Sequence, residues 1–553
     1  MNEAAPPPSA LAPFRHGIFR SVWIATLASS FGGMIQGVGA AWLMVALAAS
    51  AQMVTLVQAS MTLPIVLLAL VAGALADAFD RRRLMLVAQV FMLVVSAVLA
   101  ATAWLGLVTP WLLLVFTFLI GCGAALNAPA WHASVGSMVP RQDLPSAIAL
   151  NSMGFNVARS VGPALGGVIV AVVGAAAAFT VNALSYIGLI VVLGRWRPAP
   201  EPRVLPRERL GQAILTGIRY VSMSPNISST LVRGLVTGIG ASSVMALLPL
   251  VARDSMQGGA ATYGLLLGAF GAGAVVAAFA SQRLRAAHSN ERIVRFALAG
   301  SALGIAVTAL STSILLTAAA LVVCGVGWVL TLSTLNATVQ MSAPRWVVAR
   351  ALSLYQMATF GGIAAGSWLW GAVTEASGLA TALLVGAAVQ LGGVLLGRWF
   401  AVPDTEDIQL DLRRFSEPET DVPVQGRTGP IVVTIEYRIA PKDTYEFLGA
   451  MAERRQAQRR NGARRWTLLR DLADAQVWIE RFHCPTWTEY LRHRERFTTD
   501  DGLVGQRVRA LHCGPDKPVV RRLLERQTGF PPEGPEVEPR EWTPPMTDPS
   551  RLS

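Results

Sequence analysis

Lysine is almost absent from this sequence of 553 residues, occurring only as Lys442 and Lys517. A phosphate-cradling P-loop requires a lysine directly after a glycine, whereas these two lysines follow Pro441 and Asp516. The sequence also has no nucleophile elbow and no dinucleotide-binding fingerprint. These absences exclude a pump driven by P-loop ATP hydrolysis, and we predict no cofactor.

Cysteine is also scarce, and its spacing suggests neither a disulfide framework nor a metal site. Cys122 and Cys324 lie within apolar runs, the other two cysteines lie far apart near the C-terminal end, and no CxxC pair occurs. Those two cysteines follow His483 and His512, but neighbouring residues of a strand point to opposite faces. We therefore predict that the protein binds no metal.

Charged residues make up only 14% of the chain, hydrophobic residues make up 53%, and the mean hydropathy is +0.47. Because a soluble protein needs a more charged surface, this composition indicates a membrane protein. The net charge of +12 would suggest nucleic acid as the partner of a soluble protein. Here the arginines occupy short loops and the C-terminal tail, as the positive-inside rule expects. We expect the partners to be a lipid bilayer and a small-molecule substrate, and not nucleic acid.

Twelve apolar runs are each about twenty residues long or longer, which is enough to cross the hydrocarbon core as helices. They begin near Phe19, Val54, Leu84, Trp111, Ala147, Ala175, Ser229, Tyr263, Ile293, Ile314, Ala351 and Leu379. A segment rich in proline and arginine, Arg195 to Arg219, separates the first six from the second six. The sequence therefore predicts an all-α polytopic membrane protein with 12 transmembrane helices. Its six-helix halves would be residues 19–197 and 228–400, joined by a central loop, residues 198–227.

Basic residues alternate between the loops on the two sides of the predicted membrane. One side holds nearly all of them, at Arg15, Arg20, Arg81 to Arg83, Arg141, Arg283 to Arg295, Arg345 and Arg350. The opposite loops hold essentially only Arg253. Because basic loops remain in the cytoplasm, we expect both termini, including residues 1–18, and the central loop to be cytoplasmic. The polar start of the chain shows no signal-peptide cleavage site, so we expect no cleaved leader.

An internal repeat relates the two predicted halves. After Pro140-Arg141 come Ala147, Leu150, Gly162, Gly167 and Gly174, and after Pro344-Arg345, at the same spacings, come Ala351, Leu354, Gly366, Gly371 and Gly378. Glycine and alanine are frequent enough here to match by chance, but the shared Pro-Arg favours a true repeat. Two parallel six-helix units of this kind are typical of transporters whose halves rock about a central site.

A polar linker, residues 401–429, follows the last apolar run. Apolar and polar residues then alternate through Ile431–Ile439, as in a half-buried strand. A helix, two strands, a second helix and a short strand ending near His512 follow. The order βαββαβ predicts a ferredoxin-like α+β cytoplasmic domain over residues 430–513. The proline-rich residues 514–553 are predicted to be disordered.

Arg159 lies about four turns into the fifth predicted span, a costly position unless it faces a partner or a watery cavity. Asn151 and Asn156 precede it and give that helix a polar stripe. Other intramembrane polar residues could line the same cavity or simply bond between helices; they are Gln36, Asn127, Asn336, Tyr355 and Gln356. Carboxylates are missing at mid-depth, so no proton carrier can be named. The deep positive charge favours a substrate with an anionic, phenolic or carbonyl-rich group.

The loop between the second and third spans contains Gly73, Asp77, Arg81 and Arg82. It resembles the loop signature of the major facilitator superfamily, in which a glycine lets two helices approach and arginines lock the cytoplasmic side. The resemblance implies a cytoplasmic gate made by these four residues. Two positions depart from the signature, Ala78 and Asp80.

The fifth span continues with Gly162-Pro163-Ala-Leu-Gly166-Gly167. This run looks like the motif of antiporters and exporters of that superfamily. The proline frees a backbone carbonyl, and the glycines permit close helix contact and bending.

Together with these motifs, Phe19–Trp23 and Leu150–Pro163 resemble the enterobactin-exporter-like branch of the superfamily, over roughly residues 14 to 400. The resemblance implies a multi-pass exporter of siderophore-like or drug-like molecules in the bacterial inner membrane. With a P-loop pump excluded, it would be a secondary active transporter, and we predict proton antiport. Import by the same fold is the alternative direction.

The C-terminal stretch, with Glu480, Phe482 and Trp487–Arg492, resembles the tail of many bacterial members of this branch. Its βαββαβ order is similar to that of antibiotic-biosynthesis monooxygenases, small dimeric barrels of which several oxidise aromatic substrates without a cofactor. A membrane-tethered monooxygenase is therefore a second candidate function. Members of the branch often have histidine where Tyr490 stands, so we predict a non-catalytic domain, with no catalytic residues, that forms a homodimer or regulates transport.

Overall fold

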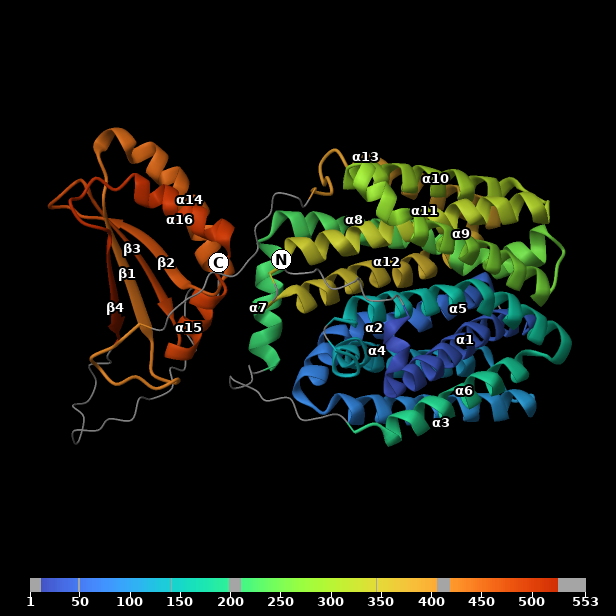
Figure 1. Ribbon diagram of the computed structural model, residues 1–553. Helices are drawn as coiled ribbons and strands as arrows, with labels where there is room; N and C mark the ends of the chain where they lie inside the picture. The colour runs from blue at the N-terminus through green and yellow to red at the C-terminus, as the bar shows by residue number, and fades with distance from the viewer. Residues whose placement is uncertain are drawn as a thin grey trace, which may run out of the picture. The chain divides into compact units, whose positions relative to one another are not determined.

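The computed structural model describes most of the chain, namely residues 11–47, 50–140, 142–197, 210–344, 346–404 and 418–525. The chain divides into two compact units. The first contains the long helices, and the second contains a four-stranded sheet with its own helices, together with Leu215–Pro225 and Met341–Val348 (Figure 1).

Among the described residues, the first unit has twelve helices of 18 to 30 residues. They are α1 (Gly17–Ala46), α2 (Ala51–Ala78), α3 (Arg81–Trp104), α4 (Pro110–Ser134), α5 (Leu144–Val173), α6 (Ala175–Arg195), α8 (Pro225–Leu250), α9 (Ala260–Ala287), α10 (Asn290–Leu310), α11 (Ile314–Ser342), α12 (Val348–Ser377) and α13 (Leu379–Leu396). Eleven of these, all except α12, are long and apolar enough to cross a membrane. The prediction of a polytopic helical membrane protein is therefore confirmed, with eleven candidate spans among the described residues.

The helix α12 is the eleventh of the twelve predicted spans, and its composition, not its length of 30 residues, keeps it out of that group. It nevertheless packs inside the unit. The Trp370 ring is fully buried and donates from Nε1 to the Ile239 carbonyl of α8 at 2.8 Å. A Cβ on Gly362 would lie 2.3 Å from the Leu235 carbonyl oxygen. Glycine is therefore required for the contact between α8 and α12.

The repeat seen in the sequence has a structural counterpart at the end of each half. The helices α5 and α12 both have 30 residues, and each is followed by a glycine with positive φ, +99° at Gly174 and +89° at Gly378. Residues other than glycine rarely adopt this backbone conformation, so a glycine here allows the chain to turn directly into the next helix. The two halves thus repeat a helix, a left-handed glycine and a final helix.

Short helices and caps shape several of the connections between the long helices. Asp80 caps the start of α3 by accepting from the Arg83 backbone N–H at 3.0 Å. The central loop contains a helix, α7 (Leu210–Ser222), where the sequence suggested only a proline- and arginine-rich segment. Arg141 and Arg345, the basic residues of the repeat, lie outside the described residues.

In the second unit, four strands form one sheet in the order β2-β3-β1-β4, with every neighbouring pair antiparallel. The elements are β1 (Ile431–Arg438), α14 (Thr444–Arg460), β2 (Arg464–Arg470), β3 (Val477–Cys484), α15 (Trp487–Glu495), α16 (Thr499–Ala510) and β4 (Val519–Leu524). The inward side chains of β1 are buried with Phe447 and Met451 of α14, and the alternation predicted for this strand is observed.

The last strand differs from the prediction. The segment before His512 is the helix α16, whose start is fixed by a capping box between Thr498 and Asp501. His512 makes only an isolated bridge to Ile439, and the fourth strand, β4, lies within the segment that we expected to be disordered. Two arginines in its short run VVRRLL hide the strand pattern, which pairing with β1 stabilises.

A buried carboxylate joins the sheet to α14. Glu480 is fully buried and accepts hydrogen bonds from Tyr437 Oη (2.9 Å), Arg454 Nε (2.7 Å), Gln458 Nε2 (3.1 Å) and Trp466 Nε1 (2.9 Å). Burial, followed by the Glu480 charge, raises the pKa of the Tyr437 hydroxyl. Four donors satisfy the carboxylate, so removing its charge would leave several buried donors without an acceptor.

His493 of α15 makes the stability of this unit depend on pH. Its side chain is buried, its Nε2 lies 2.8 Å from Gln458 Oε1, and burial lowers its pKa to about 3. An unfolded histidine titrates near pH 6.5. Between pH 6.5 and 3 the unfolded chain therefore binds a proton that the folded chain does not. The free energy of unfolding should fall as the pH falls, by up to about 1.4 kcal/mol per pH unit.

Thermal unfolding of the detergent-purified protein at pH 7, 6 and 5 tests this expectation. The variant His493→Phe keeps a ring between Phe482 and Phe497 and should lose less stability on acidification than the wild type. Equal slopes in the two proteins would show that other groups control the acid sensitivity.

Candidate functional site

Arg159 of α5 lies in the middle of its helix and reaches helices of the other half. Its Cζ is 5.7 Å from the centroid of the Phe270 ring on α9 and 6.0 Å from that of the Trp328 ring on α11. Cations are attracted to aromatic faces at such distances. Within the part of the chain that the structure describes, no carboxylate lies within ion-pair distance of Arg159. The aromatic rings of the second half therefore hold a positive charge from the first.

Several polar atoms beside Arg159 have no partner among the described residues. Trp328 Nε1 and Ser160 Oγ are buried and make no hydrogen bond there. Phe270 and Trp328 also line an internal cavity of about 10 Å³, room for about one water. Thr331 Oγ1 and Gln390 Oε1 line the same cavity and make no hydrogen bond to any described residue. Unsatisfied buried polar groups of this kind mark a place where water or a ligand binds.

The predicted polar stripe on α5 is only partly directed at this site. Asn151, Asn156 and Arg159 are all half-buried. The Asn156 amide donates to the Ser152 carbonyl of its own helix at 2.9 Å. Of the three, Arg159 contacts the aromatic rings of the second half.

Gln36 is placed elsewhere, in a buried polar cluster between α1, α3 and α6. Its Oε1 accepts from Ser96 Oγ at 3.4 Å and from the Asn182 amide. Asn182 Nδ2 also lies 3.2 Å from Tyr186 Oη. This cluster satisfies polar groups within the first half, and nothing joins it to Arg159 among the described residues.

The other predicted substrate residues lie in three places. Asn127 of α4 has a buried Oδ1 with no partner among the described residues. Asn336 of α11 accepts from Gln340 one turn later. Tyr355 of α12 is buried and donates to the Leu332 carbonyl at 3.3 Å, whereas Gln356 is exposed. The structure thus groups Tyr355 with α11, and it does not bring these residues into one cluster with Arg159.

The helix-5 motif packs α5 on two neighbours. A Cβ on Gly162 would lie 2.7 Å from Met34 Cβ, and a Cβ on Gly166 would lie 3.1 Å from Ile35 Cα, both on α1. Gly167 instead faces the other half, where a Cβ would lie 2.8 Å from Gly264 Cα and from the Ala260 carbonyl oxygen of α9. Pro163 is buried within the same turn. Two motif glycines therefore pack α5 within its half, and the third closes the contact with the other.

The repeat supplies a second contact of the same kind. Gly371 of α12 occupies the position that Gly167 has in α5, and a Cβ there would lie 2.8 Å from Gln52 Cα and 2.3 Å from Thr55 Oγ1 of α2. Each half thus uses the equivalent glycine to reach the start of the second helix of the other half. We call these two contacts, α5 with α9 and α12 with α2, the seam.

The seam is closed at the end of the bundle where α5 and α12 finish. There the Gln52 backbone N–H donates to Glu375 Oε1 at 3.0 Å, and the Trp42 and Tyr263 rings stack with centroids 6.5 Å apart. At the opposite end the approach is looser, because a Cβ on Gly73 of α2 would lie 3.9 Å from Ser353 Oγ of α12. The structure therefore shows a close approach of α2 and α12 near Gly371 and a wider one near Gly73.

The predicted gate residues lie at that looser end. Gly73 faces α12, as a residue that lets helices approach would do. Arg82 donates from Nε to the Leu193 carbonyl at 2.7 Å and from Nη2 to the Gly194 carbonyl at 2.6 Å. Cations stabilise helix C-termini in this way, so Arg82 caps α6 in this state. Arg81 is the first residue of α3, and the Asp77 side chain lies outside the described residues, so their pairing stays a prediction.

Sequence reasoning missed the two aromatic partners of Arg159. A signal existed for Trp328, since tryptophan usually lies at membrane interfaces and this one lies mid-way along α11. Phe270 gave no signal, because phenylalanine is common throughout apolar helices.

The family model for transmembrane secretion effectors matches residues 8–528 of this sequence, nearly its whole length. The chain belongs to this family, a branch of the major facilitator superfamily. The match extends through the sheet unit, so this transmembrane secretion effector carries its C-terminal domain as part of the family's architecture. The predicted resemblance of that domain to monooxygenases is not confirmed by this match.

Curated relatives align with more than half of the chain. The chain is 28% identical over 334 residues to the enterobactin exporter EntS of Shigella boydii serotype 18, covering 59% of this chain and 78% of the relative. It is 26% identical over 363 residues to EntS of Escherichia coli O6:K15:H31, covering 65% and 83%.

Solved structures support the fold at low sequence identity. A bacterial homologue of the lysosomal transporter Spinster, crystallised inward-facing and unoccupied, aligns with a TM-score of 0.54 at 13% identity, covering 70% of this chain and 96% of that one. The POT family transporter PepTSo gives a TM-score of 0.56 at 14% identity, covering 70% of this chain and 99% of that one. Relatives and structural neighbours are transporters, so this effector is a membrane transporter and not an enzyme.

Proposed function

We propose that this effector exports siderophore-like or drug-like molecules from the cytoplasm across the bacterial inner membrane, driven by proton antiport. The observation that carries the proposal is Arg159, a mid-membrane cation held only by aromatic rings among the described residues. Such a cation can pair with an anionic or phenolic group of a substrate, and Phe270 and Trp328 can stack on its rings. Relatives named as exporters of enterobactin support the same substrate class.

We further propose that α12 also crosses the membrane, which makes twelve spans in all, and that both termini are cytoplasmic. Its buried packing on α8 supports the first point, and the basic loops support the second. In that orientation the closed end of the seam faces outward. An impermeant thiol reagent should label the exposed Cys513 only after the membrane is permeabilised. Labelling in intact cells would show that the C-terminus faces outward, opposite to the proposed orientation.

We also propose a ferredoxin-like arrangement for the C-terminal domain, which the strand order β2-β3-β1-β4 supports. The sheet face away from α14 carries Val432, Thr434 and Glu436. We propose that two copies of the protein form a homodimer through this face of the sheet. Cross-linking of the purified protein tests this, and a full-length protein that stays monomeric at high concentration would contradict it.

Accumulation assays test the export function directly. Everted membrane vesicles containing the effector should take up a labelled catecholate siderophore when a proton gradient is imposed, and an uncoupler should abolish the uptake. Vesicles from cells lacking the protein are the control. Uptake that persists with the uncoupler would show that transport is not coupled to protons. Uptake by right-side-out vesicles alone would show that the protein is an importer.

A further inference from the structure

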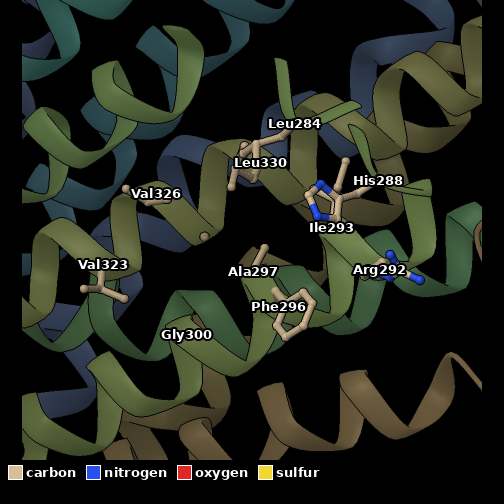
Figure 2. A pocket seen from close by; sticks show the side chains of 11 residues that line it. Leu284, His288, Arg292, Ile293, Phe296, Ala297, Gly300, Val323, Val326 and Leu330 are labelled. Atoms are coloured by element: carbon tan, nitrogen blue, oxygen red, sulfur yellow. The ribbon is translucent and has the colours of Figure 1, made fainter. Parts of the chain in front are cut away.

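A groove lies between α9, α10 and α11, apart from the site around Arg159. It encloses about 220 Å³. Its walls are almost entirely apolar, and they include Leu284, Ile293, Phe296, Gly300, Val326 and Leu330. In Figure 2 the imidazole of His288 and the guanidinium of Arg292 lie together near one end of the groove, and Val323 lies at the other.

The groove runs inward from the turn between α9 and α10. Arg292 lies in the first turn of α10, and Gly300 lies eight residues later, about 12 Å further along the helix at 1.5 Å per residue. Phe296 is 72% exposed and Val323 is 43% exposed, so the groove opens on the apolar outer surface of the helices. A molecule that fills it must be apolar along most of its length.

An arginine and a histidine, and no acidic residue, are among the residues that line the groove. Arg292 and His288 are exposed, and within the described residues no carboxylate pairs with Arg292. The nearby Glu291 is already held by Arg295 at 2.6 Å and by Arg233 at 3.5 Å. The mouth therefore offers a cation without a counter-ion in the described part of the chain, beside the turn between α9 and α10.

We propose that this groove binds one anionic phospholipid of the cytoplasmic leaflet. The phosphate lies against Arg292 and His288, and one acyl chain fills the apolar groove as far as Gly300. Basic pockets between transmembrane helices on the cytoplasmic side bind anionic headgroups by the same chemistry. The assignment rests on the proposed orientation, which places the α9–α10 turn in the cytoplasm.

The lipid would act on the substrate site through α11. Gly327 lines this groove and also the small cavity beside Trp328. A Cβ on Gly327 would lie 2.5 Å from the Ala297 carbonyl oxygen, so α10 and α11 touch closely there. An acyl chain that lies in the groove, over this contact, thus supports the segment that carries Trp328, one of the two rings that hold Arg159.

Native mass spectrometry and thermal unfolding of the full-length protein in neutral detergent test the proposal. The probes are phosphatidylglycerol, phosphatidylethanolamine and inorganic phosphate. The wild type should retain one phosphatidylglycerol and unfold at a higher temperature with it, while inorganic phosphate alone should have no effect. Arg292→Gln should weaken phosphatidylglycerol binding about fivefold, with a similar further loss when His288→Gln is added. Arg283→Gln, an exposed arginine at the same end of α9 that does not line the groove, should bind as the wild type does.

A second pair of variants tests the acyl-chain contact. Gly300→Leu should fill the groove and reduce binding, whereas Gly300→Ala should not, because its Cβ would lie 3.5 Å from Val323 Cγ1, an ordinary contact. If Gly300→Leu fails to fold, phospholipid binding by the Arg292 and His288 variants is the test of the proposal. If both phospholipids bind equally and these variants do not change the binding, the groove holds only non-specific boundary lipid. Stabilisation by inorganic phosphate alone would make it an anion site, and either result overturns the proposal.

Discussion

Replacing Arg159 by methionine should raise the substrate concentration needed for half-maximal efflux by roughly tenfold or more, since hydrogen bonds to charged groups contribute about 1.5–3 kcal/mol. Methionine keeps much of the bulk but removes the charge that lies over Phe270 and Trp328. Because no described carboxylate pairs with Arg159, its loss leaves no uncompensated charge, and expression should stay normal. Efflux from cells over a range of internal substrate concentrations provides the measurement.

Two matched variants separate a substrate contact from a structural one. Arg159→Lys keeps the charge but loses the planar guanidinium that stacks on rings, so it should recover part of the affinity. Phe270→Leu removes one ring and should also weaken binding while leaving the charge in place. If Arg159→Met reduces expression and leaves the affinity unchanged, the arginine serves packing and the proposed substrate site is wrong.

Adding one methyl group at Gly167 should stop most transport. In Gly167→Ala the new Cβ would lie 2.8 Å from Gly264 Cα and the Ala260 carbonyl oxygen, and backbone atoms cannot give way cheaply. Overpacking of this kind costs about 1–3 kcal/mol, which shifts a two-state equilibrium roughly five- to more than a hundredfold. The cost falls on the state in which this end of the seam is closed. The transporter should therefore accumulate in the opposite state.

The chain offers a matched control on the same pair of helices. In Gly268→Ala the Cβ would lie 3.4 Å from Ala164 Cβ, so transport should stay near the wild-type rate. Gly371→Ala, at the equivalent glycine, should reproduce the Gly167→Ala defect. Efflux rates measure transport. The labelling of a cysteine introduced at Tyr263 measures whether this end of the seam is open or closed. Wild-type efflux in Gly167→Ala would show that this glycine packs without taking part in the conformational cycle.

Composition and residue spacing were enough to predict the class of the molecule and much of its organisation. Long apolar runs can only be buried in a bilayer, so composition and run length alone predicted a polytopic membrane protein. The spacing that relates Gly162, Gly167 and Gly174 to the second half predicted the repeat, and Gly174 and Gly378 share the same left-handed backbone conformation. The depth of Arg159 in its span was equally local information, because it depends only on counting along one helix.

The residues that these side chains face could be identified only in the folded molecule. It placed Phe270 and Trp328 against Arg159, moved Gln36 into a separate polar cluster, and aimed Gly167 at α9 while its motif neighbours face α1. It also placed β4 beyond the predicted end of the C-terminal domain, where pairing with β1 and not local preference makes the strand. Helical periodicity reports which side of one helix is polar or small. The partner on that side comes from a distant part of the chain and is fixed by packing among all the helices at once.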